Sequence, residues 1–286
     1  MKFSREDVTF TSHGAALRGW LYRPEGDTPK PGVVMAHGLT AVREMFLDLY
    51  AEAFACAGFM TLVYDHFGFG VSDGEPRQSP APSLQLEGYR DAIAWLRRQS
   101  GVDPDRIGVW GSSYSGGQVI MLAAEPLPIR CAVAQVPGFS MGGLQLSAAT
   151  VAEITAAIQN GRLDDVIPAA TATADGLGIM YQDDAHDWFT RVSRERAPTW
   201  RNEVRIGALT EPFEPIDFLV RTRIPLRCIV APDDRLTPPD EGIKIAATVP
   251  LIDLVQISGG HFTAYEAGFD ESARLAVDWF ARHLAD

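Results

Sequence analysis

Gly111-Ser112-Ser113-Tyr114-Ser115-Gly116-Gly117 is the stretch that decides the fold, because a strand signal precedes it and a helix signal follows it. The upstream run 106–110 is short and apolar, as in a buried strand, and residues 118–124 read as a helix. A serine held between strand and helix, with very small neighbours, sits on a sharp turn that pushes its hydroxyl into a pocket. The stretch therefore predicts a nucleophile elbow.

Three serines compete for the role of nucleophile in this turn. Side chains two positions before and after the reactive serine would collide, so both must be small. Around Ser113 these positions hold Gly111 and Ser115, whereas Ser112 would have the bulky Trp110. Ser115 also has small flanks, but it would lie two residues into the helix. We therefore predict that Ser113 is the nucleophile.

Strand and helix signals alternate on both sides of this turn. Continuous apolar runs such as Gly32–Ala36 indicate strands buried on both faces of a parallel sheet. We predict strands over 8–12, 16–23, 32–36, 59–64, 106–110, 129–136, 226–231 and 251–257, and helices over about 45–57, 84–99, 118–124, from 238 onward and 273–284. The fold class is therefore α/β, a mostly parallel sheet flanked by helices, with ligands bound beyond the carboxyl ends of its strands.

One segment interrupts the alternation. Residues 138–222 lack strand-like runs, and they are too many for a bare loop in a compact domain. Five apolar residues recur there at helical spacing: Leu144, Ala148, Val151, Ile154 and Ile158. We expect a helical cap insertion over 138–222 and a core made of 1–137 and 223–286. The apolar character of this cap is compatible with a homodimer.

His261 is the predicted general base. It stands in Ser258-Gly259-Gly260-His261-Phe262, directly after the last predicted strand, at the edge of the sheet where Ser113 also emerges. A lone histidine is more often structural, and a Gly- and Ser-rich turn alone can be structural too. The chain position of His261 and its glycine flanks favour the catalytic interpretation.

The carboxylate that orients this histidine should follow the penultimate strand. The loop 231–238 offers Asp233 and Asp234, which point in opposite directions if the loop is extended, so only one faces His261. We predict Asp234, with Asp233 as the alternative. The negative charge of Asp240 is better placed to stabilise the N-terminus of the helix that begins near it.

Two backbone N–H groups are candidates for an oxyanion hole. The N–H of Tyr114 comes with the elbow, and a second donor should follow the strand that ends at Ala36. Leu39 is the first candidate for this second donor and Thr40 is the next. His37 more naturally shapes the turn than serves as a second base.

Signals for metals and cofactors are weak. The run Asp183-Asp184-Ala185-His186-Asp187 lacks a second histidine or cysteine at a ligand spacing, and such charge clusters usually form a solvated face. Gly68-Phe69-Gly70 lacks the third glycine of a dinucleotide fingerprint, and no phosphate loop is present. We expect neither a metal nor a cofactor.

Length, charge and cysteine content exclude several classes of protein. With 286 residues and a net charge of −12, the chain can bury a large core and is a poor partner for nucleic acid or an anionic membrane. No apolar run approaches the ~20 residues that cross a bilayer, and residues 1–7 lack the apolar core of a secretory signal. Cys56, Cys131 and Cys228 fall in predicted core elements, so we expect buried, reduced thiols and a cytoplasmic protein.

With these residues placed, the chain resembles the α/β-hydrolase superfamily over essentially its whole length. The order nucleophile, acid, histidine matches, and the stretches 64–72 and 111–117 resemble the dienelactone-hydrolase-like and Xaa-Pro-dipeptidyl-peptidase-like serine esterases. The resemblance implies Ser113, Asp234 and His261 as a catalytic triad. Ser115 departs from the usual glycine, and Leu39 argues against a lipase-like Gly-Gly-Gly oxyanion loop.

These residues predict a cofactor-independent serine hydrolase. Its substrate would be a small-molecule carboxylic ester or thioester of a small to medium hydrophobic acyl compound, cleaved through an acyl-enzyme on Ser113. An acyltransferase or thioesterase of a biosynthetic pathway is the alternative enzyme, and a small-molecule receptor on the same fold is the alternative without catalysis. A proline-specific peptidase is less expected, because no extra domain is evident to recognise an amino terminus.

Overall fold

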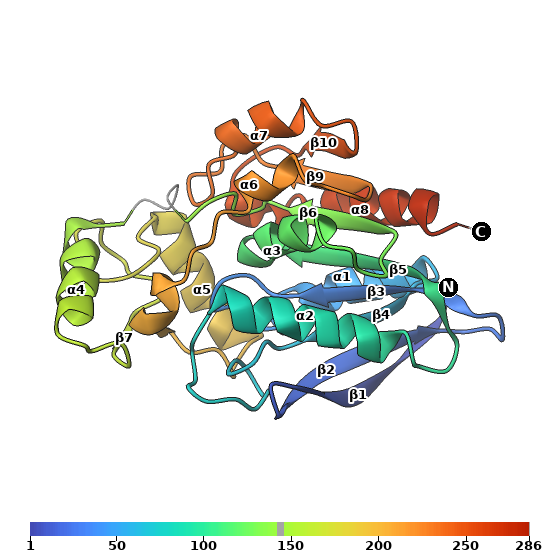
Figure 1. The fold of residues 1–286 in the computed structure, drawn as a ribbon, viewed down its shortest axis with the longest axis horizontal. Helices are drawn as coiled ribbons and strands as arrows, with labels where there is room; N and C mark the ends of the chain where they lie inside the picture. The colour runs from blue at the N-terminus through green and yellow to red at the C-terminus, as the bar shows by residue number, and fades with distance from the viewer. Residues whose placement is uncertain (142–145, 286) are drawn as a thin grey trace.

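The computed structural model describes residues 1–141 and 146–285, which contain one large sheet of eight strands (Figure 1). Its strand order is β1-β2-β4-β3-β5-β6-β9-β10. The bounds are β1 (Phe3–Ser12), β2 (Ala15–Pro24), β3 (Lys30–Ala36), β4 (Met60–Tyr64), β5 (Val102–Ser112), β6 (Cys131–Gln135), β9 (Leu226–Val230) and β10 (Ile252–Gln256). β2 is antiparallel to both β1 and β4, and the remaining neighbours are parallel, which confirms the predicted mostly parallel sheet.

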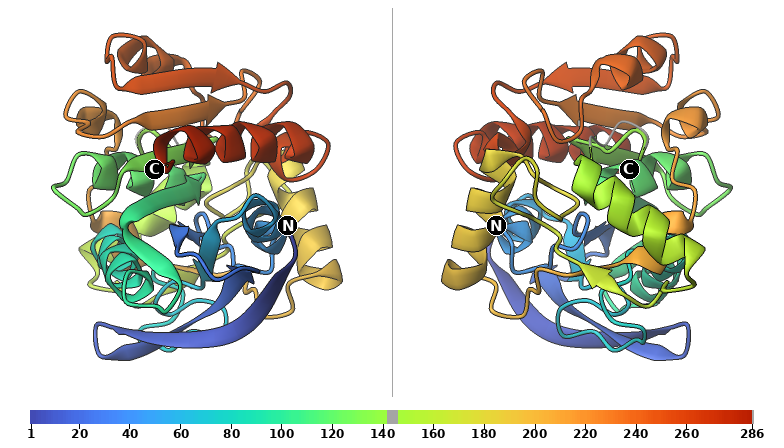
Figure 2. Two further views of the ribbon diagram at one scale, coloured as in Figure 1. Left: turned by 90° about the vertical axis from the view of Figure 1, so that its right-hand side faces the viewer. Right: turned by 90° about the vertical axis from the view of Figure 1, so that its left-hand side faces the viewer.

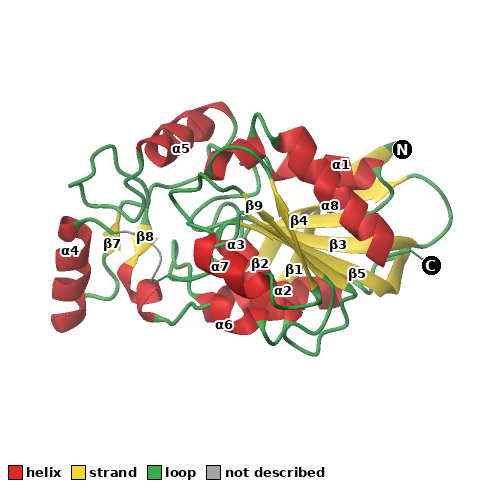
Figure 3. Ribbon diagram, turned by 90° about the horizontal axis from the view of Figure 1, so that it is seen from above, coloured by secondary structure: helices red, strands yellow, loops and turns green. Residues whose placement is uncertain are grey.

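Helices cover both faces of this sheet (Figure 3). On one face pack α1 (Leu47–Cys56) and α8 (Phe269–His283), and on the other α2 (Pro82–Leu96) and α3 (Tyr114–Ala123). The alternation of a strand divides its side chains between the two layers. In β3, Val33 and Met35 join the core that includes α1 and α8. Val34 and Ala36 join the core that includes α2 and α3. All four are fully buried, which explains the uninterrupted apolar run in the sequence.

Most of the chain between β6 and β9 lies beyond one end of the sheet. It forms α4 (Ala148–Gln159), β7 (Val166–Ile167), α5 (Asp183–Glu195), β8 (Val204–Arg205), the 3₁₀ helix η1 (Ile206–Thr210) and α6 (Ile216–Leu219). The right-hand view of Figure 2 looks onto α4 and α5 in front of this end. The prediction that the segment lacks strands is wrong in one detail, because β7 and β8 pair antiparallel over two residues each.

Helix α4 lies within the stretch where the helical spacing predicted a helix, and Ile154 packs against the core as expected, but the buried face is shifted around the helix. Leu144 lies outside the described residues. Val151 and Ile158, which we expected on a buried stripe, are 50% and 47% exposed, whereas Thr150 and Ala157 are buried. Thr150 is accommodated because its hydroxyl donates to the Gly178 carbonyl at 2.9 Å. A buried hydroxyl with a partner therefore replaces the expected apolar contact.

The cysteines depart from expectation at one position. Cys131 and Cys228 are buried in β6 and β9 as predicted, but Cys56, the last residue of α1, is exposed. Its side chain leaves the core at the helix end, where Gly58 adopts a φ of 99° and turns the chain toward β4. Within 1–141 and 146–285, no helix has both the length and the apolar character to cross a membrane.

Candidate active site

Ser113 occupies the single residue between β5 and α3. Its backbone φ of 60° and ψ of −121° form a sharp turn that reverses the chain direction. Gly111 is required on the strand side, because a Cβ there would overlap the backbone of Ser115. Parallel register brings Ala36 of β3 opposite Gly111, so the loop after β3 reaches the same edge as Ser113. A Cβ on Gly38 in this loop would lie 2.9 Å from the Cβ of Ser113.

The structure brings Ser113, His261 and Asp234 into one hydrogen-bonded chain. The Nε2 atom of His261 lies 3.0 Å from the Oγ of Ser113, and its Nδ1 atom lies 2.7 Å from the Oδ2 of Asp234. His261 begins the 3₁₀ helix η2 (His261–Tyr265) after β10, and Asp234 lies in the loop between β9 and α7 (Asp240–Ala246). Both side chains are almost fully buried, whereas Asp233 is exposed. Asp234, and not Asp233, faces the histidine.

The carboxylate of Asp234 is held in its ionised form. Burial alone would raise its pKa, but the charge and hydrogen bond of His261 and the hydrogen bonds of Thr237 outweigh this, so the pKa lies below its usual value. The N–H groups of Leu236 and Thr237 donate to Oδ1 at 2.9 Å and 2.7 Å. The Thr237 hydroxyl donates to Oδ2 at 2.8 Å.

Thr237 was not predicted from the sequence. Its hydroxyl also lies 3.1 Å from the Nδ1 atom of His261, so it contacts both members of the pair. The spacing Asp-x-x-Thr was the available signal, since a carboxylate readily accepts from N–H groups two and three residues later. That the Thr237 hydroxyl reaches the histidine depends on the packing of η2 against this loop, which no local pattern records.

The backbone N–H groups of Leu39 and Tyr114 are available to donate hydrogen bonds to a substrate oxygen. Among the described residues, neither donates a hydrogen bond. Both residues line the same pocket as Ser113. Thr40, the second candidate of this loop, has a φ of 58° and is fully buried, and it does not line that pocket. The geometry favours Leu39 over Thr40.

The two competing serines face away from His261. The Ser112 Oγ atom lies 2.6 Å from the buried Tyr265 hydroxyl. Ser115 is fully buried and donates to the carbonyl of His37, while its Oγ also lies 3.1 Å from the Nε2 atom of His66. These contacts agree with the sequence-based choice of Ser113.

His37 and His66 form the back wall of the elbow. The N–H of His66 donates to Nε2 of His37 at 3.1 Å, so Nδ1 of His37 carries the proton and donates to the Gly38 carbonyl at 2.9 Å. Burial lowers the pKa of His37 to about 4 and that of His66 well below its usual value. Both rings are therefore neutral, and His37 shapes the loop that carries Gly38 and Leu39.

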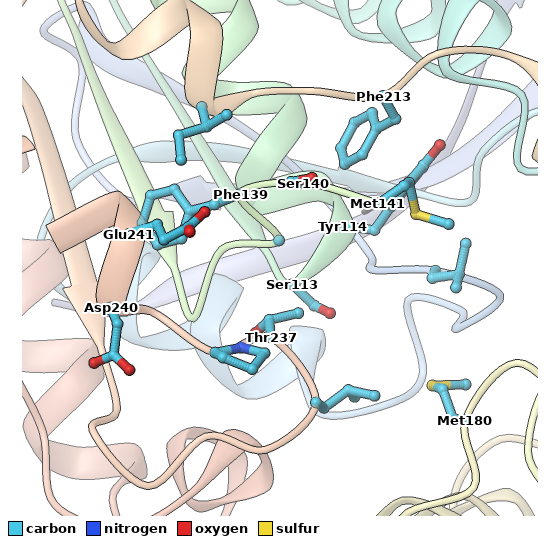
Figure 4. Close-up of a pocket in the computed structure, with 15 residues that line it drawn as sticks. Ser113, Tyr114, Phe139, Ser140, Met141, Met180, Phe213, Thr237, Asp240 and Glu241 are labelled. Atoms are coloured by element: carbon cyan, nitrogen blue, oxygen red, sulfur yellow. The ribbon is translucent and has the colours of Figure 1, made fainter. Parts of the chain in front are cut away.

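A pocket of about 420 Å³ opens above Ser113 (Figure 4). Tyr114, Phe139, Met141, Met180 and Phe213 give it an apolar lining. In Figure 4, Asp240 and Glu241 lie on one side of Ser113, and Phe213, Met141 and Met180 lie on the other. The ring of Phe213 stacks on that of Tyr114 at a centroid distance of 4.0 Å, which fixes part of the apolar wall.

The acidic run 183–187 lies in the first turn of α5, away from this pocket lining. The carboxylates of Asp183 and Asp184 stabilise the positive end of the helix dipole there. A carboxylate oxygen of Asp184 lies 3.7 Å from the guanidinium of Arg235. Within the part of the chain that the structure describes, no group of three or more His, Cys, Asp or Glu side chains has the arrangement of a metal site.

Comparison with known proteins agrees with this fold. Residues 13–204 match the model of the family described as X-Pro dipeptidyl-peptidase (S15 family). The chain is 28% identical to the quorum-quenching protein AidA of Acinetobacter baumannii, over 96% of this chain and 94% of that protein. It is 41% identical to the thiohydrolase aneE of Aspergillus aculeatus over 44% of this chain and 39% of that one. The crystal structure of the α/β hydrolase GrgF from Penicillium has a TM-score of 0.84 at 21% identity, covering 99% of this chain and all of that one.

Proposed function

Because this chain belongs to the X-Pro dipeptidyl-peptidase (S15) family of α/β hydrolases, we propose that it is a serine hydrolase with Ser113 as its nucleophile. Its substrate would be a carboxylic ester or thioester with a small to medium hydrophobic acyl group. The observation that carries the proposal is the position of His261, whose two ring nitrogens contact Ser113 and Asp234 at once. This arrangement gives a hydroxyl both a base and a partner for the charge that the base acquires.

The reaction would proceed in two steps. The Oγ of Ser113 attacks the carbonyl carbon, and its proton passes to Nε2 of His261. When the tetrahedral intermediate collapses, the bond from carbon to the leaving oxygen or sulfur breaks, and His261 returns the proton to that atom. Water then attacks the acyl-enzyme, His261 takes its proton, and the acid leaves as Ser113 regains its hydrogen. Asp234 stabilises the imidazolium in both steps.

The N–H groups of Leu39 and Tyr114 would bind the oxyanion. Within the described residues neither group donates a hydrogen bond, and donors already oriented before reaction cost no reorganisation when charge develops. Each donor of this kind contributes on the order of 3 kcal/mol to transition-state stabilisation. Gly38 allows the loop that carries Leu39 to approach Ser113, because a side chain at residue 38 would collide with Ser113.

The apolar lining supports a hydrophobic acyl group. Residues Phe139, Met141, Met180, Phe213 and Ile216 come from the segment 138–222, which we propose to act as a cap that shapes the pocket. A chain of several methylene groups would gain about 0.8 kcal/mol for each one buried there.

Asp240 and Glu241 favour one further candidate. Both carboxylates are exposed and line the pocket, so they would attract a substrate with a cationic end, such as the free amino terminus of a peptide. Turnover of a glycyl-prolyl anilide tests this peptidase activity directly. Release of the aniline, lost in the double variant D240N/E241Q, would support it.

A fluorophosphonate probe tests the proposed nucleophile. It should label the protein covalently, and mass spectrometry should place the adduct on Ser113. The Ser113→Ala variant should not react, whereas Ser115→Ala should still be labelled. An adduct on another serine, or no adduct under conditions where the protein is folded, would overturn the assignment.

A further inference from the structure

A second, much smaller hollow adjoins Ser113 on the side of His261. Its volume is about 30 Å³, compared with about 420 Å³ for the larger pocket. Leu39, Met180 and Leu236 line both spaces and so form the partition between them. Ser113 borders both, at the point where they meet.

The two hollows differ in which reacting groups they contain. His261 lines the small hollow and not the large pocket, whereas Tyr114 lines the large pocket and not the small hollow. The leaving oxygen must lie within hydrogen-bond reach of the imidazole that protonates it. The group attached to that oxygen therefore extends on the His261 side, and the acyl group, on the opposite bond of the same carbon, extends into the large pocket.

The small hollow has room for very little. A cavity needs roughly 10–15 Å³ to hold one water molecule, so 30 Å³ corresponds to about two. Methanol is of this size, and an aromatic alcohol such as benzyl alcohol is several times larger.

The walls of the small hollow are packed and buried. The ring of Trp188 stacks on Phe262 at 4.8 Å and meets Phe189 edge-on at 5.0 Å. Met45 and Leu47 complete the wall and are almost fully buried. Close-packed aromatic walls yield little to a larger ligand without moving α5 as a whole.

We propose that the small hollow is the subsite for the leaving group and for the acceptor, and that it restricts the enzyme to small alcohol or thiol leaving groups and to water or a short alcohol as acceptor. This inference rests on the proposed serine-hydrolase function. In deacylation, the acceptor hydroxyl gives its proton to His261 and its oxygen bonds to the acyl carbon. The bond from that carbon to Oγ of Ser113 then breaks, and His261 returns the proton to Oγ. The structure thereby favours hydrolysis over transfer to a bulky acceptor.

Acceptor competition tests the inference with one common acyl-enzyme. The protein would be supplied with methyl hexanoate in water containing equal concentrations of ethanol and benzyl alcohol, and the hexanoic acid and both new esters would be quantified. We expect acid and ethyl ester, with benzyl ester at least about tenfold below ethyl ester after correction for uncatalysed exchange. Equal yields of the two esters would overturn the subsite assignment.

Three variants sharpen the test. Met45→Ala enlarges only the small hollow and should raise benzyl ester relative to ethyl ester. Ile216→Ala enlarges only the large pocket at a half-buried position, so it should change acyl-chain preference and leave the ester ratio unchanged. Ala41→Leu fills the small hollow and should suppress ethyl ester further; it keeps the test decisive if Met45→Ala fails to fold.

The failure of this inference is distinguishable from failure of the proposed function. If the inference alone is wrong, Ser113 still reacts with fluorophosphonate and hexanoate is still released, but the acceptor ratio is insensitive to Met45→Ala and Ala41→Leu. If the proposed function is wrong, Ser113→Ala forms acid and esters as fast as the unmodified protein does.

Discussion

Two serine–histidine pairs lie side by side at the elbow, and only one of them has the surroundings of a catalyst. The Oγ atom of Ser113 lies 3.0 Å from Nε2 of His261, and the Oγ atom of Ser115 lies 3.1 Å from Nε2 of His66. The Nδ1 atom of His261 contacts a carboxylate, whereas Nδ1 of His66 is buried with no hydrogen-bond partner among the described residues. Ser113 borders the pocket, whereas Ser115 is fully enclosed.

The difference shows that a hydrogen bond between serine and histidine does not by itself make a nucleophile. A base must hold a proton during reaction, and burial without a counter-charge makes the imidazolium of His66 very unfavourable. We call Ser113 and His261 the outer pair and Ser115 and His66 the inner pair. The inner pair therefore has a structural role. Since Ser115 donates to the His37 carbonyl, Nε2 of His66 donates to Ser115, and the three residues connect the elbow to the loop of Leu39.

Exchanging the two serines for alanine gives the largest contrast. Ser113→Ala should lower the turnover of methyl hexanoate on the order of 10⁴-fold or more, because the attacking oxygen is lost. Ser115→Ala should retain activity within about tenfold, because Ser113, His261 and Asp234 are untouched. Acid release in a pH-stat measures both. An equally large loss in Ser115→Ala would remove the distinction between the pairs.

The carboxylate is the second point of difference. Asp234→Asn should reduce turnover by about 10³- to 10⁴-fold, since an amide cannot stabilise the imidazolium and favours the wrong tautomer of His261. Asp233→Asn is the matched control at the neighbouring, exposed position and should leave turnover nearly unchanged. If the two variants behaved alike, Asp234 would not be the acid that serves His261.

The neutral histidines of the back wall should appear in the pH dependence of stability. The pKa of His37 falls from near 6.5 to about 4 on folding, so the unfolded chain binds more protons below pH 6.5. The stabilisation is complete above about pH 6.5 and is lost as the pH falls toward 4, at up to about 1.4 kcal/mol per pH unit.

Urea unfolding at about pH 7.5 and pH 5 measures this loss. We expect a lower free energy of unfolding at the acidic pH, and a smaller difference in His37→Gln, which has no imidazole to titrate. An unfolding free energy that did not change between these pH values in the unmodified protein would contradict a buried neutral His37.

The smallest effect concerns the stability contributed by the inner pair. Ser115→Ala should lower the free energy of unfolding by about 1–3 kcal/mol, because the His37 carbonyl and Nε2 of His66 lose a buried partner. Ser193→Ala on α5 is the control, because among the described residues the hydroxyl of Ser193 donates only to the local Thr190 carbonyl, at 3.1 Å. That variant should stay within about 0.5 kcal/mol of the parent.

The sequence predicted the outer pair more readily than the inner one for a physical reason. In a parallel sheet, residues that follow strands meet at one edge, so Ser113, Asp234 and His261 could be brought together from chain order alone. The partners of Ser115 depend on how α3 packs against two loops. Neither His37 nor His66 follows a pattern that marks it as the neighbour of this serine.

The segment 138–222 was predicted less fully because its short elements carry weak signals. β7 and β8 have two residues each, too few to show alternation. In α5 the run Asp183–Asp187 reads as a charged surface, although Trp188 and Phe189 of the same helix are buried beside the site. The buried Thr150 and Ala157 shift the buried face of α4 away from the stripe that apolar spacing assigns to it, although Ile154 still packs against the core.

The backbone at residue 113 has a bearing on the receptor alternative. Ser113 adopts a φ of 60° and a ψ of −121°, and for a residue other than glycine this backbone conformation destabilises the folded state by about 1–3 kcal/mol. A chain that merely enclosed a ligand would gain from glycine there, or from a relaxed loop. A serine held in this unfavourable backbone conformation is expected in a protein that must present one oxygen atom at a fixed position.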